Sequence, residues 1–183
     1  MLYLIGGAPR VGKTILAQQL CTTRSVGWIS TDLLTDLVRV ATAPERTMTW
    51  DASPEAITAG ADWFFPYLER FLWGVSSLSD QYVIEGVKFL PAQVAQLRAQ
   101  YPIRAVFLGC SRMTLEDFTK FPGRSKGYSD LPEAQRRQIV EDVPRWSAFI
   151  RQEADRFGYA YVDVVNDFPR RLAEAEMVLT ARV

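Results

Sequence analysis

The chain has 183 residues, 48% of them hydrophobic and 23% charged, so it can bury a core as one compact domain and is not a disordered sequence. Its 21 basic residues balance 21 acidic ones, which argues against an extended nucleic-acid surface; with no histidine and two cysteines, a zinc site and histidine acid–base chemistry are also disfavoured. No apolar run reaches membrane-spanning length, so we expect a protein of the reducing cytoplasm without a membrane partner.

Strand and helix patterns alternate along the chain. Apolar runs of strand length occur at Leu2–Ile5, Val26–Ser30, Tyr82–Glu85, Ile103–Leu108 and Tyr159–Val162. Helical patterns cover Lys13–Thr22, Asp32–Val40, Pro54–Ser77, Pro91–Gln100, Pro132–Asp142, Pro144–Phe157 and Phe168–Leu179. A loop is expected at Ala41–Asp51 and a polar connection at Cys110–Asp130. The alternation predicts an α/β domain whose parallel sheet is covered by helices on both faces.

The segment between the first strand and the first helix has the pattern Gly-x-x-x-x-Gly-Lys-Thr, which is typical of a phosphate-binding loop. Its residues are Gly7, Ala8, Pro9, Arg10, Val11, Gly12, Lys13 and Thr14. The glycines let successive backbone amides converge on an anion, and the positive end of the following helix points to the same place. The alternative is an ordinary turn, but a turn has no need for Lys-Thr at this offset. The sequence therefore predicts a nucleotide-binding loop.

Residues of this loop and of the third strand end are candidates for handling phosphates and a metal ion. Lys13 would reach the β/γ-phosphates, and the hydroxyl of Thr14 would bind Mg²⁺. Arg10 adds positive potential or is simply solvated. Glu85 is the candidate to hold Mg²⁺ through water, and Gly86 would let a ligand approach the backbone closely.

Asp32 follows the second strand, where ligands of parallel sheets bind. It is the candidate to accept or orient the proton of an acceptor hydroxyl. The alternative is a capping role, because Ser30, Thr31 and Asp32 all suit the start of the following helix. Asp163, after the fifth strand, is expected to have a structural role.

Residues 112–145 combine a glycine-containing polar connection with many cations, and we interpret them as a lid. Arg124 and Arg136 are its candidate catalytic residues, because arginines stabilise a transferring phosphoryl group. The alternative is a solvated helix face with the i,i+4 pairs Glu133–Arg137 and Glu141–Arg145.

Aromatic residues crowd the segment Trp50–Trp73. Most are expected in the core, because aromatic side chains dominate burial. The segment also follows Asp32 at the place where an acceptor site would form, so Trp50 or Trp63 is a candidate to line that site.

In its motifs the chain resembles P-loop small-molecule kinases of the nucleoside monophosphate kinase kind. Ile29-Ser-Thr-Asp32, with Arg39, is similar to the adenylate-kinase segment Ile-Ser-Thr-Gly-Asp without its glycine. The loop Gly7–Thr14, the Thr31-Asp32 pair and Glu85-Gly-Val-Lys-Phe-Leu-Pro91 look closer to archaeal 2-phosphoglycerate kinases, which carry a similar Thr-Asp and Glu-Gly-Val-His-Leu-Val-Pro. Shikimate kinase, chloramphenicol phosphotransferase and zeta toxins are more distant by layout.

This resemblance implies a three-layer fold with strand order 2-3-1-4-5, ATP–Mg²⁺ as the donor, and a small-molecule acceptor bound between the helices after the second and third strands. Asp32 would face the acceptor, while Arg39 and Lys88 would bind an anionic group on it. Asn166 would lie near adenine. Lys88 replaces the family histidine, and the adenylate-kinase Asp-Gly-Phe-Pro-Arg is absent, which argues against AMP as the acceptor.

We therefore expect a cytoplasmic, ATP-dependent kinase that acts on a small hydroxylated or anionic metabolite, as a monomer or homodimer. The first alternative is an NTPase that controls a partner, although the guanine-selective Asn-Lys-x-Asp is absent. The second is a nucleotide-binding module without turnover.

Overall fold

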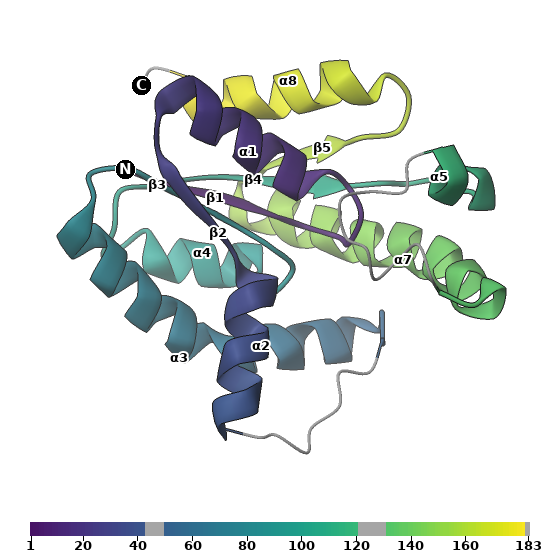
Figure 1. The fold of residues 1–183 in the computed structure, drawn as a ribbon, viewed down its shortest axis with the longest axis horizontal. Helices are drawn as coiled ribbons and strands as arrows, with labels where there is room; N and C mark the ends of the chain where they lie inside the picture. The colour runs from purple at the N-terminus through teal and green to yellow at the C-terminus, as the bar shows by residue number, and fades with distance from the viewer. Residues whose placement is uncertain (43–49, 121–130, 182–183) are drawn as a thin grey trace.

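The structure is a computed structural model that describes residues 1–42, 50–120 and 131–181. Five strands form a single parallel sheet in the order β2-β3-β1-β4-β5 (Figure 1). The strands are β1 Leu2–Gly7, β2 Gly27–Ser30, β3 Tyr82–Glu85, β4 Ile103–Gly109 and β5 Ala160–Asp163. All five predicted strands and the predicted strand order are confirmed.

Helices cover both faces of this sheet. They are α1 Lys13–Arg24, α2 Thr31–Thr42, α3 Pro54–Leu78, α4 Pro91–Leu97, α5 Leu115–Lys120, α7 Glu133–Phe157 and α8 Phe168–Thr180. Figure 1 shows α1 and α8 on one face and α3, α4 and α7 on the other, with α2 projecting beyond the end of β2. Parallel strands with helices on both faces give the three layers expected from the sequence.

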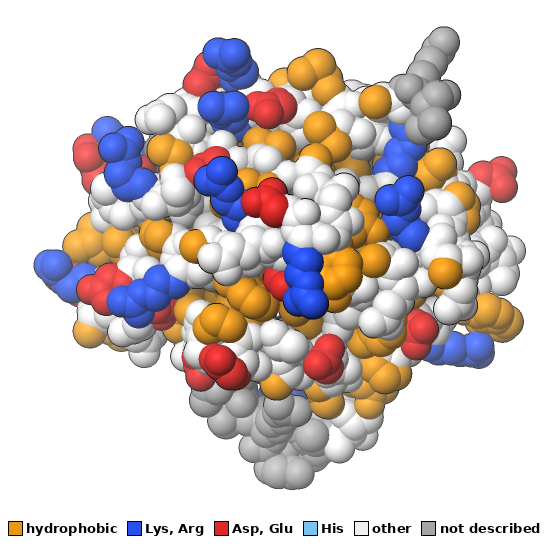
Figure 2. Space-filling model, turned by 180° about the vertical axis from the view of Figure 1, so that it is seen from behind, with side chains coloured by type: hydrophobic (Ala, Val, Ile, Leu, Met, Phe, Trp, Pro, Cys, Tyr) orange, Lys and Arg blue, Asp and Glu red, His pale blue; other side chains and the backbone are white. Residues whose placement is uncertain are grey.

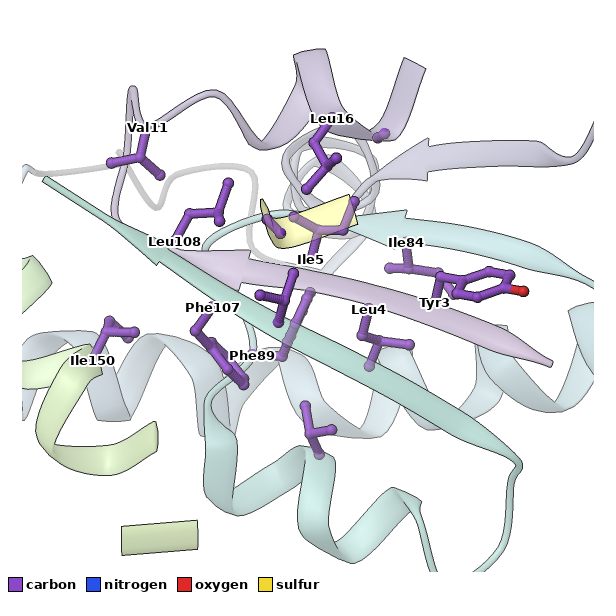
Figure 3. Close-up of a cluster of buried hydrophobic side chains, with 14 of the residues drawn as sticks. Tyr3, Leu4, Ile5, Val11, Leu16, Ile84, Phe89, Phe107, Leu108 and Ile150 are labelled. Carbon is purple, nitrogen blue, oxygen red and sulfur yellow. The ribbon is translucent and has the colours of Figure 1, made fainter. Parts of the chain in front are cut away.

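Strand β1 lies at the centre of the sheet and explains the apolar run at the start of the chain. It pairs with β3 on one side and β4 on the other, and all six of its residues are buried. Figure 3 shows Leu16 of α1 on one side of β1, with Phe89 and Phe107 on the other. The rings of Phe89 and Phe107 meet edge to face at 6.3 Å. Such two-sided burial requires apolar residues at successive positions.

The C-terminal half of the sequence differs from the prediction in two places. The two helices predicted at Pro132–Asp142 and Pro144–Phe157 are wrong as separate elements, because α7 runs through Pro144 without a break. A proline inside a helix costs about 3 kcal/mol. Here the buried residues of α7 continue on both sides of the proline, from Ile139 to Ala154, and their packing outweighs that cost. The polar connection also contains a short helix, α5, that the prediction missed.

Surface charge follows the balanced composition. On the face shown in Figure 2, basic and acidic side chains are interspersed rather than separated into regions of one sign. Within the part of the chain that the structure describes, none of the helices combines the length and apolarity needed to cross a membrane.

Candidate active site

The loop between β1 and α1 has the backbone shape of an anion site. Arg10 has φ 61° and Gly12 has φ 89°, so both lie in the left-handed region, and α1 begins directly afterwards at Lys13. Left-handed residues in such a loop turn successive amides toward one point, and the helix N-terminus adds positive potential there. A Cβ on Gly12 would lie 2.6 Å from Cζ of Phe168, so this position has room only for glycine.

Lys13 is held across this loop. Its side chain is buried, and Nζ donates a 2.6 Å hydrogen bond to the carbonyl oxygen of Ala8. Burial lowers the pKa of the Lys13 ammonium, whereas the carboxylates of Glu85 and Asp32 act in the opposite direction. The loop thus holds a cation close to both carboxylates predicted for the site.

The side chains of Thr14 and Glu85 are in contact beside the phosphate loop. The Thr14 hydroxyl donates a 3.0 Å hydrogen bond to Oε1 of Glu85, which is only 2% exposed. The sheet brings them together, because Glu85 ends β3 directly beside Ile5 of β1. Burial raises the pKa of the Glu85 carboxyl; hydrogen bonds from Ser30 and Thr14 and the charge of Lys13 partly offset this.

These two oxygen ligands fit a magnesium ion. Mg²⁺ prefers hard oxygen donors and binds through one or two protein groups together with waters and substrate phosphates. Hydroxyl and carboxylate oxygens 3.0 Å apart provide such a pair beside the phosphate loop. Among the described residues, no group of three or more cysteine, aspartate or glutamate side chains is placed so that it could hold a metal ion. The donor set therefore fits a metal that arrives with its nucleotide.

Asp32 lies in the first turn of α2 and lines the same cavity as Lys13. Its backbone amide donates to the Ser30 hydroxyl at 3.2 Å, and Ser30 also hydrogen-bonds Glu85. Ser30 thus supplies the capping contact, which leaves the exposed carboxylate of Asp32 open to the cavity. The predicted capping alternative applies to Ser30 rather than to the Asp32 side chain.

One open cavity of about 1490 Å³ lies at the carboxyl ends of the strands. Sites for a single ligand usually measure roughly 300–1,000 Å³. The predicted site residues that line the cavity are Pro9, Arg10, Gly12, Lys13, Thr14, Asp32, Arg39, Glu85, Lys88 and Asn166. Trp50 and Trp63 line it too, as the aromatic segment suggested. The cavity thus has room for two ligands.

Other predicted residues lie elsewhere. Of the described candidates, Gly7, Ala8, Val11, Gly86 and Arg136 are not part of the cavity lining. Gly86 packs against α2 instead: its φ is 155°, and a Cβ there would lie 1.7 Å from Oγ1 of Thr31. Its lack of a side chain therefore makes room for Thr31.

The predicted lid is only partly described. Arg124 lies outside the described residues, and Arg136 is half-buried in the first turns of α7. The predicted i,i+4 pairs on α7 are present, with Arg137 2.5 Å from Glu133 and Arg145 4.0 Å from Glu141. These pairs match the solvated-face alternative for Arg137 and Arg145.

The loop after β5 contributes Val165, Asn166 and Asp167 to the cavity lining. Asn166 and Asp167 have φ of 57° and 55°, and Asp167 caps α8 by accepting from the amide of Arg170. Arg112 donates to Oδ1 of Asn166 at 3.4 Å. The expected structural role of Asp163 is confirmed, because its Oδ1 accepts from the amides of Ser111 and Val165.

One cluster at the cavity was not foreseen. Nε1 of Trp50 donates a 2.7 Å hydrogen bond to Oδ2 of Asp142, a buried residue of α7. The Trp50 ring also packs against Trp146, with centroids 5.8 Å apart. The sequence separation of 92 residues between Trp50 and Asp142 leaves no local signal for this contact.

Solved structures share this fold. A gluconokinase from Sinorhizobium meliloti matches with a TM-score of 0.50 and 15% identity, over 97% of this chain and 90% of that chain. An uncharacterized protein from Eubacterium ventriosum matches with a TM-score of 0.53 and 14% identity, over 100% and 99%. A shikimate kinase from Aquifex aeolicus gives a TM-score of 0.48 and 14% identity, over 98% and 96%.

Neither a protein-family model nor a curated protein sequence matches the chain. At identities near 15% the structural likeness establishes the fold alone. The five-stranded parallel sheet, its order 2-3-1-4-5 and its flanking helices are those of the P-loop kinase fold.

Proposed function

We propose that this protein is an ATP- and Mg²⁺-dependent phosphotransferase that moves the γ-phosphate to the hydroxyl of a small hydroxylated or anionic metabolite. One observation carries the proposal: a single cavity contains the phosphate loop with Lys13, the Thr14–Glu85 oxygen pair and, beyond them, the carboxylate of Asp32. A hydrolase needs the first two features but has no need for the room that this cavity leaves for a second ligand. The fold shared with a gluconokinase adds support at the level of architecture.

On the donor side, the loop amides, Gly12 and Lys13 hold the phosphates of ATP, and the loop that includes Asn166 lies toward adenine. Thr14 and Glu85 hold Mg²⁺, which when bound neutralises charge on the phosphates. The lysine ammonium needs no large rearrangement to reach this position, because the fold already buries it against Ala8.

On the acceptor side, Asp32 accepts the proton of the attacking hydroxyl. The hydroxyl oxygen forms a bond to the γ-phosphorus while the bond from that phosphorus to the β–γ bridging oxygen breaks, and ADP leaves. Arg39 and Lys88 hold an anionic group of the acceptor, and both line the cavity on the side of α2 and α3. Gly86 supports the acceptor side of the cavity, because its lack of a side chain allows Thr31, and therefore α2, to approach β3.

Several narrower assignments belong to the same proposal. The motif similarity to 2-phosphoglycerate and adenylate kinases suggests an acceptor related to theirs in size and charge. Arg124 and Arg136 are proposed to reach the transferring phosphoryl group from a lid over residues 112–145. The proposed setting is the cytoplasm, with the protein acting as a monomer or homodimer.

Incubation with γ-labelled ATP, Mg²⁺ and a panel of small hydroxy acids and polyols tests the proposal. We expect label to move to at least one acceptor, with stoichiometric ADP release. Release of phosphate at a rate that no acceptor changes would instead indicate an NTPase. Absence of ATP binding in calorimetry would contradict both enzyme functions.

A further inference from the structure

Ser30 connects the two halves of the cavity. It is the last residue of β2 and the register partner of Glu85, the last residue of β3, so the two lie side by side at the edge of the sheet. The next two residues, Thr31 and Asp32, begin α2. Ser30 is 8% exposed and lines the cavity. It therefore lies between the carboxylate proposed to hold the metal and the carboxylate proposed to face the acceptor.

The Ser30 hydroxyl makes one hydrogen bond toward each half. Its oxygen accepts from the backbone amide of Asp32 at 3.2 Å, and the same side chain hydrogen-bonds the carboxylate of Glu85. A carboxylate only accepts hydrogen bonds, so the hydroxyl donates its single proton to Glu85 and uses a lone pair for the amide. The donor and acceptor roles of this hydroxyl are thus filled by opposite sides of the site.

These hydrogen bonds continue to the phosphate loop. Thr14 donates to Oε1 of the same Glu85 at 3.0 Å. One chain of hydrogen bonds therefore runs from the first turn of α2, through Ser30 and Glu85, to the first turn of α1. Linked hydrogen bonds polarise one another and restrain all of their members. The chain thus ties the helix that carries Asp32 to the helix that begins at Lys13.

This connection acts against electrostatic repulsion. Burial raises the pKa of the Glu85 carboxyl, and the charge of Asp32 raises it further, which means that the two carboxylates repel each other. Thr31 packs against Gly86, but among the described residues its Oγ1 has no hydrogen-bond partner. Thr31 therefore contributes packing, and the directional restraint comes from Ser30.

We infer that Ser30 is a positioning residue that fixes the separation between the carboxylates of Glu85 and Asp32, and so aligns the metal side of the cavity with the acceptor side. This inference rests on the proposed function and adds a residue to it. Ser30 acts through its two hydrogen bonds, and it takes no proton from the substrate. Because phosphoryl transfer depends mainly on positioning, loss of this hydroxyl should affect both sides together.

The variant Ser30→Ala removes both hydrogen bonds and keeps Cβ. The first measured quantity is the Mg²⁺ concentration for half-maximal ATP turnover, which should rise about tenfold, as when a partner that orients a metal ligand is lost. The second is the single-turnover rate of phosphoryl transfer at saturating ATP and Mg²⁺, which should fall roughly 10- to 100-fold. The acceptor is the hydroxy acid or polyol to which the wild type transfers label fastest, or water where none accepts label.

Other variants distinguish positioning from a general loss of stability. Ser30→Thr keeps the hydroxyl and should restore most of both losses, and Ser30→Cys, whose thiol is a weak donor, replaces Ser30→Ala if that variant does not fold. Ser53→Ala is the matched control, because Ser53 caps α3 by accepting from the amide of Ala56 at 3.3 Å and is not among the lining residues. It should lower the melting temperature, as a lost cap does, and leave both measured quantities unchanged.

A double-mutant cycle tests whether Ser30 acts through Asp32. In an Asp32→Asn background, Ser30→Ala should slow transfer much less than it slows the wild type, because the group that it positions is already gone. Fully additive losses would contradict this coupling.

The outcomes keep this inference apart from the proposed function. If the wild type transfers label to an acceptor, a change in only one of the two quantities, or no rescue by Ser30→Thr, overturns the inference alone. Hydrolysis by the wild type that no acceptor changes contradicts the proposed function, while the two measurements with water still test Ser30. A wild type that neither binds nor turns over ATP would contradict both.

Discussion

The hydroxyl of Thr14 donates a 3.0 Å hydrogen bond to Oε1 of Glu85, and this contact joins the first turn of α1 to the end of β3. Both residues line the cavity together with residues of the phosphate loop, where a nucleotide would bring a magnesium ion. Ser30 also hydrogen-bonds Glu85, and the charge of Lys13 lies close by, so this buried carboxylate has polar partners within the protein.

The first prediction concerns magnesium. Glu85→Gln and Thr14→Ala should each raise the Mg²⁺ concentration for half-maximal ATP turnover by about tenfold or more, the size expected when a metal-orienting group is lost. Turnover is measured over a magnesium titration at saturating ATP. Glu174→Gln, which removes a half-buried carboxylate of α8 that pairs with Arg171, is the control. An unchanged magnesium requirement in both site variants would exclude the pair as the metal site.

The second prediction concerns pH and stability. Burial raises the pKa of Glu85 above its ordinary value of 4.5, so the charged form is less favourable in the folded protein than in the unfolded chain. The wild type therefore loses stability as the pH rises through 4.5 toward the raised value. Glu85→Gln lacks this loss, so its melting temperature relative to wild type should increase between pH 4 and 7. Parallel melting curves across this range, without nucleotide, would contradict the assignment.

The third prediction separates chemistry from binding. Asp32 is exposed in the cavity, and its amide is already capped by Ser30. Asp32→Asn should slow phosphoryl transfer by roughly 10²–10⁴-fold, as loss of a general base does, while ATP affinity changes little. Single-turnover rates and calorimetry measure the two effects. Asp155→Asn, an exposed site near the end of α7, is the control. Equal losses in rate and affinity would count against a role in proton transfer.

The fourth prediction uses a cysteine as a reporter. Cys110 lines the cavity and is 8% exposed, and burial raises the pKa of its thiol to about 11. About one thiol in a thousand is then ionised at pH 8. In a Cys21→Ser background, the rate of Cys110 alkylation by iodoacetamide should be slow and should rise about tenfold per pH unit up to pH 9. Bound ATP–Mg²⁺ should suppress this reaction.

The matched control for this reaction is Cys21 in a Cys110→Ser background. Cys21 lies on α1 and is not among the described lining residues, so ATP–Mg²⁺ should leave its rate unchanged. A rate for Cys110 that levels off below pH 9 would contradict the raised pKa of its thiol. A rate that nucleotide does not alter would contradict its place in the cavity wall.

Local chemistry made much of this site predictable. The Gly7–Thr14 loop depends on backbone shape and one lysine, both of which a short motif specifies. Glu85 and Asp32 follow from the rule that parallel strands end at one edge. The strand order came from resemblance, because the sequence pattern alone does not say which strands become neighbours.

The features of the site and fold that the sequence did not predict depend on contacts between residues far apart in the chain. The hydrogen bond between Trp50 and Asp142 exists only because α7 returns to the cavity after the sheet is complete. Pro144 looked like a helix boundary, yet burial along α7 on both sides of it outweighs the local penalty. The sequence suggested that Gly86 lets a ligand approach the backbone. In the structure its neighbour is Thr31, and no local pattern predicts this contact.

The central claim is that the loop at Gly7–Thr14 binds ATP–Mg²⁺, and calorimetry of nucleotide binding to wild type and Lys13→Ala tests it most directly. Lys13 lies across the loop, so its loss should weaken binding by about 10- to 150-fold, the range for a charge-assisted hydrogen bond. The circular dichroism spectrum should be unchanged, and Arg156→Ala, an exposed cation on α7, should bind like wild type. Saturable binding in wild type that Lys13→Ala largely removes is the predicted result; equal affinity in both proteins, or no binding to wild type, would contradict the account.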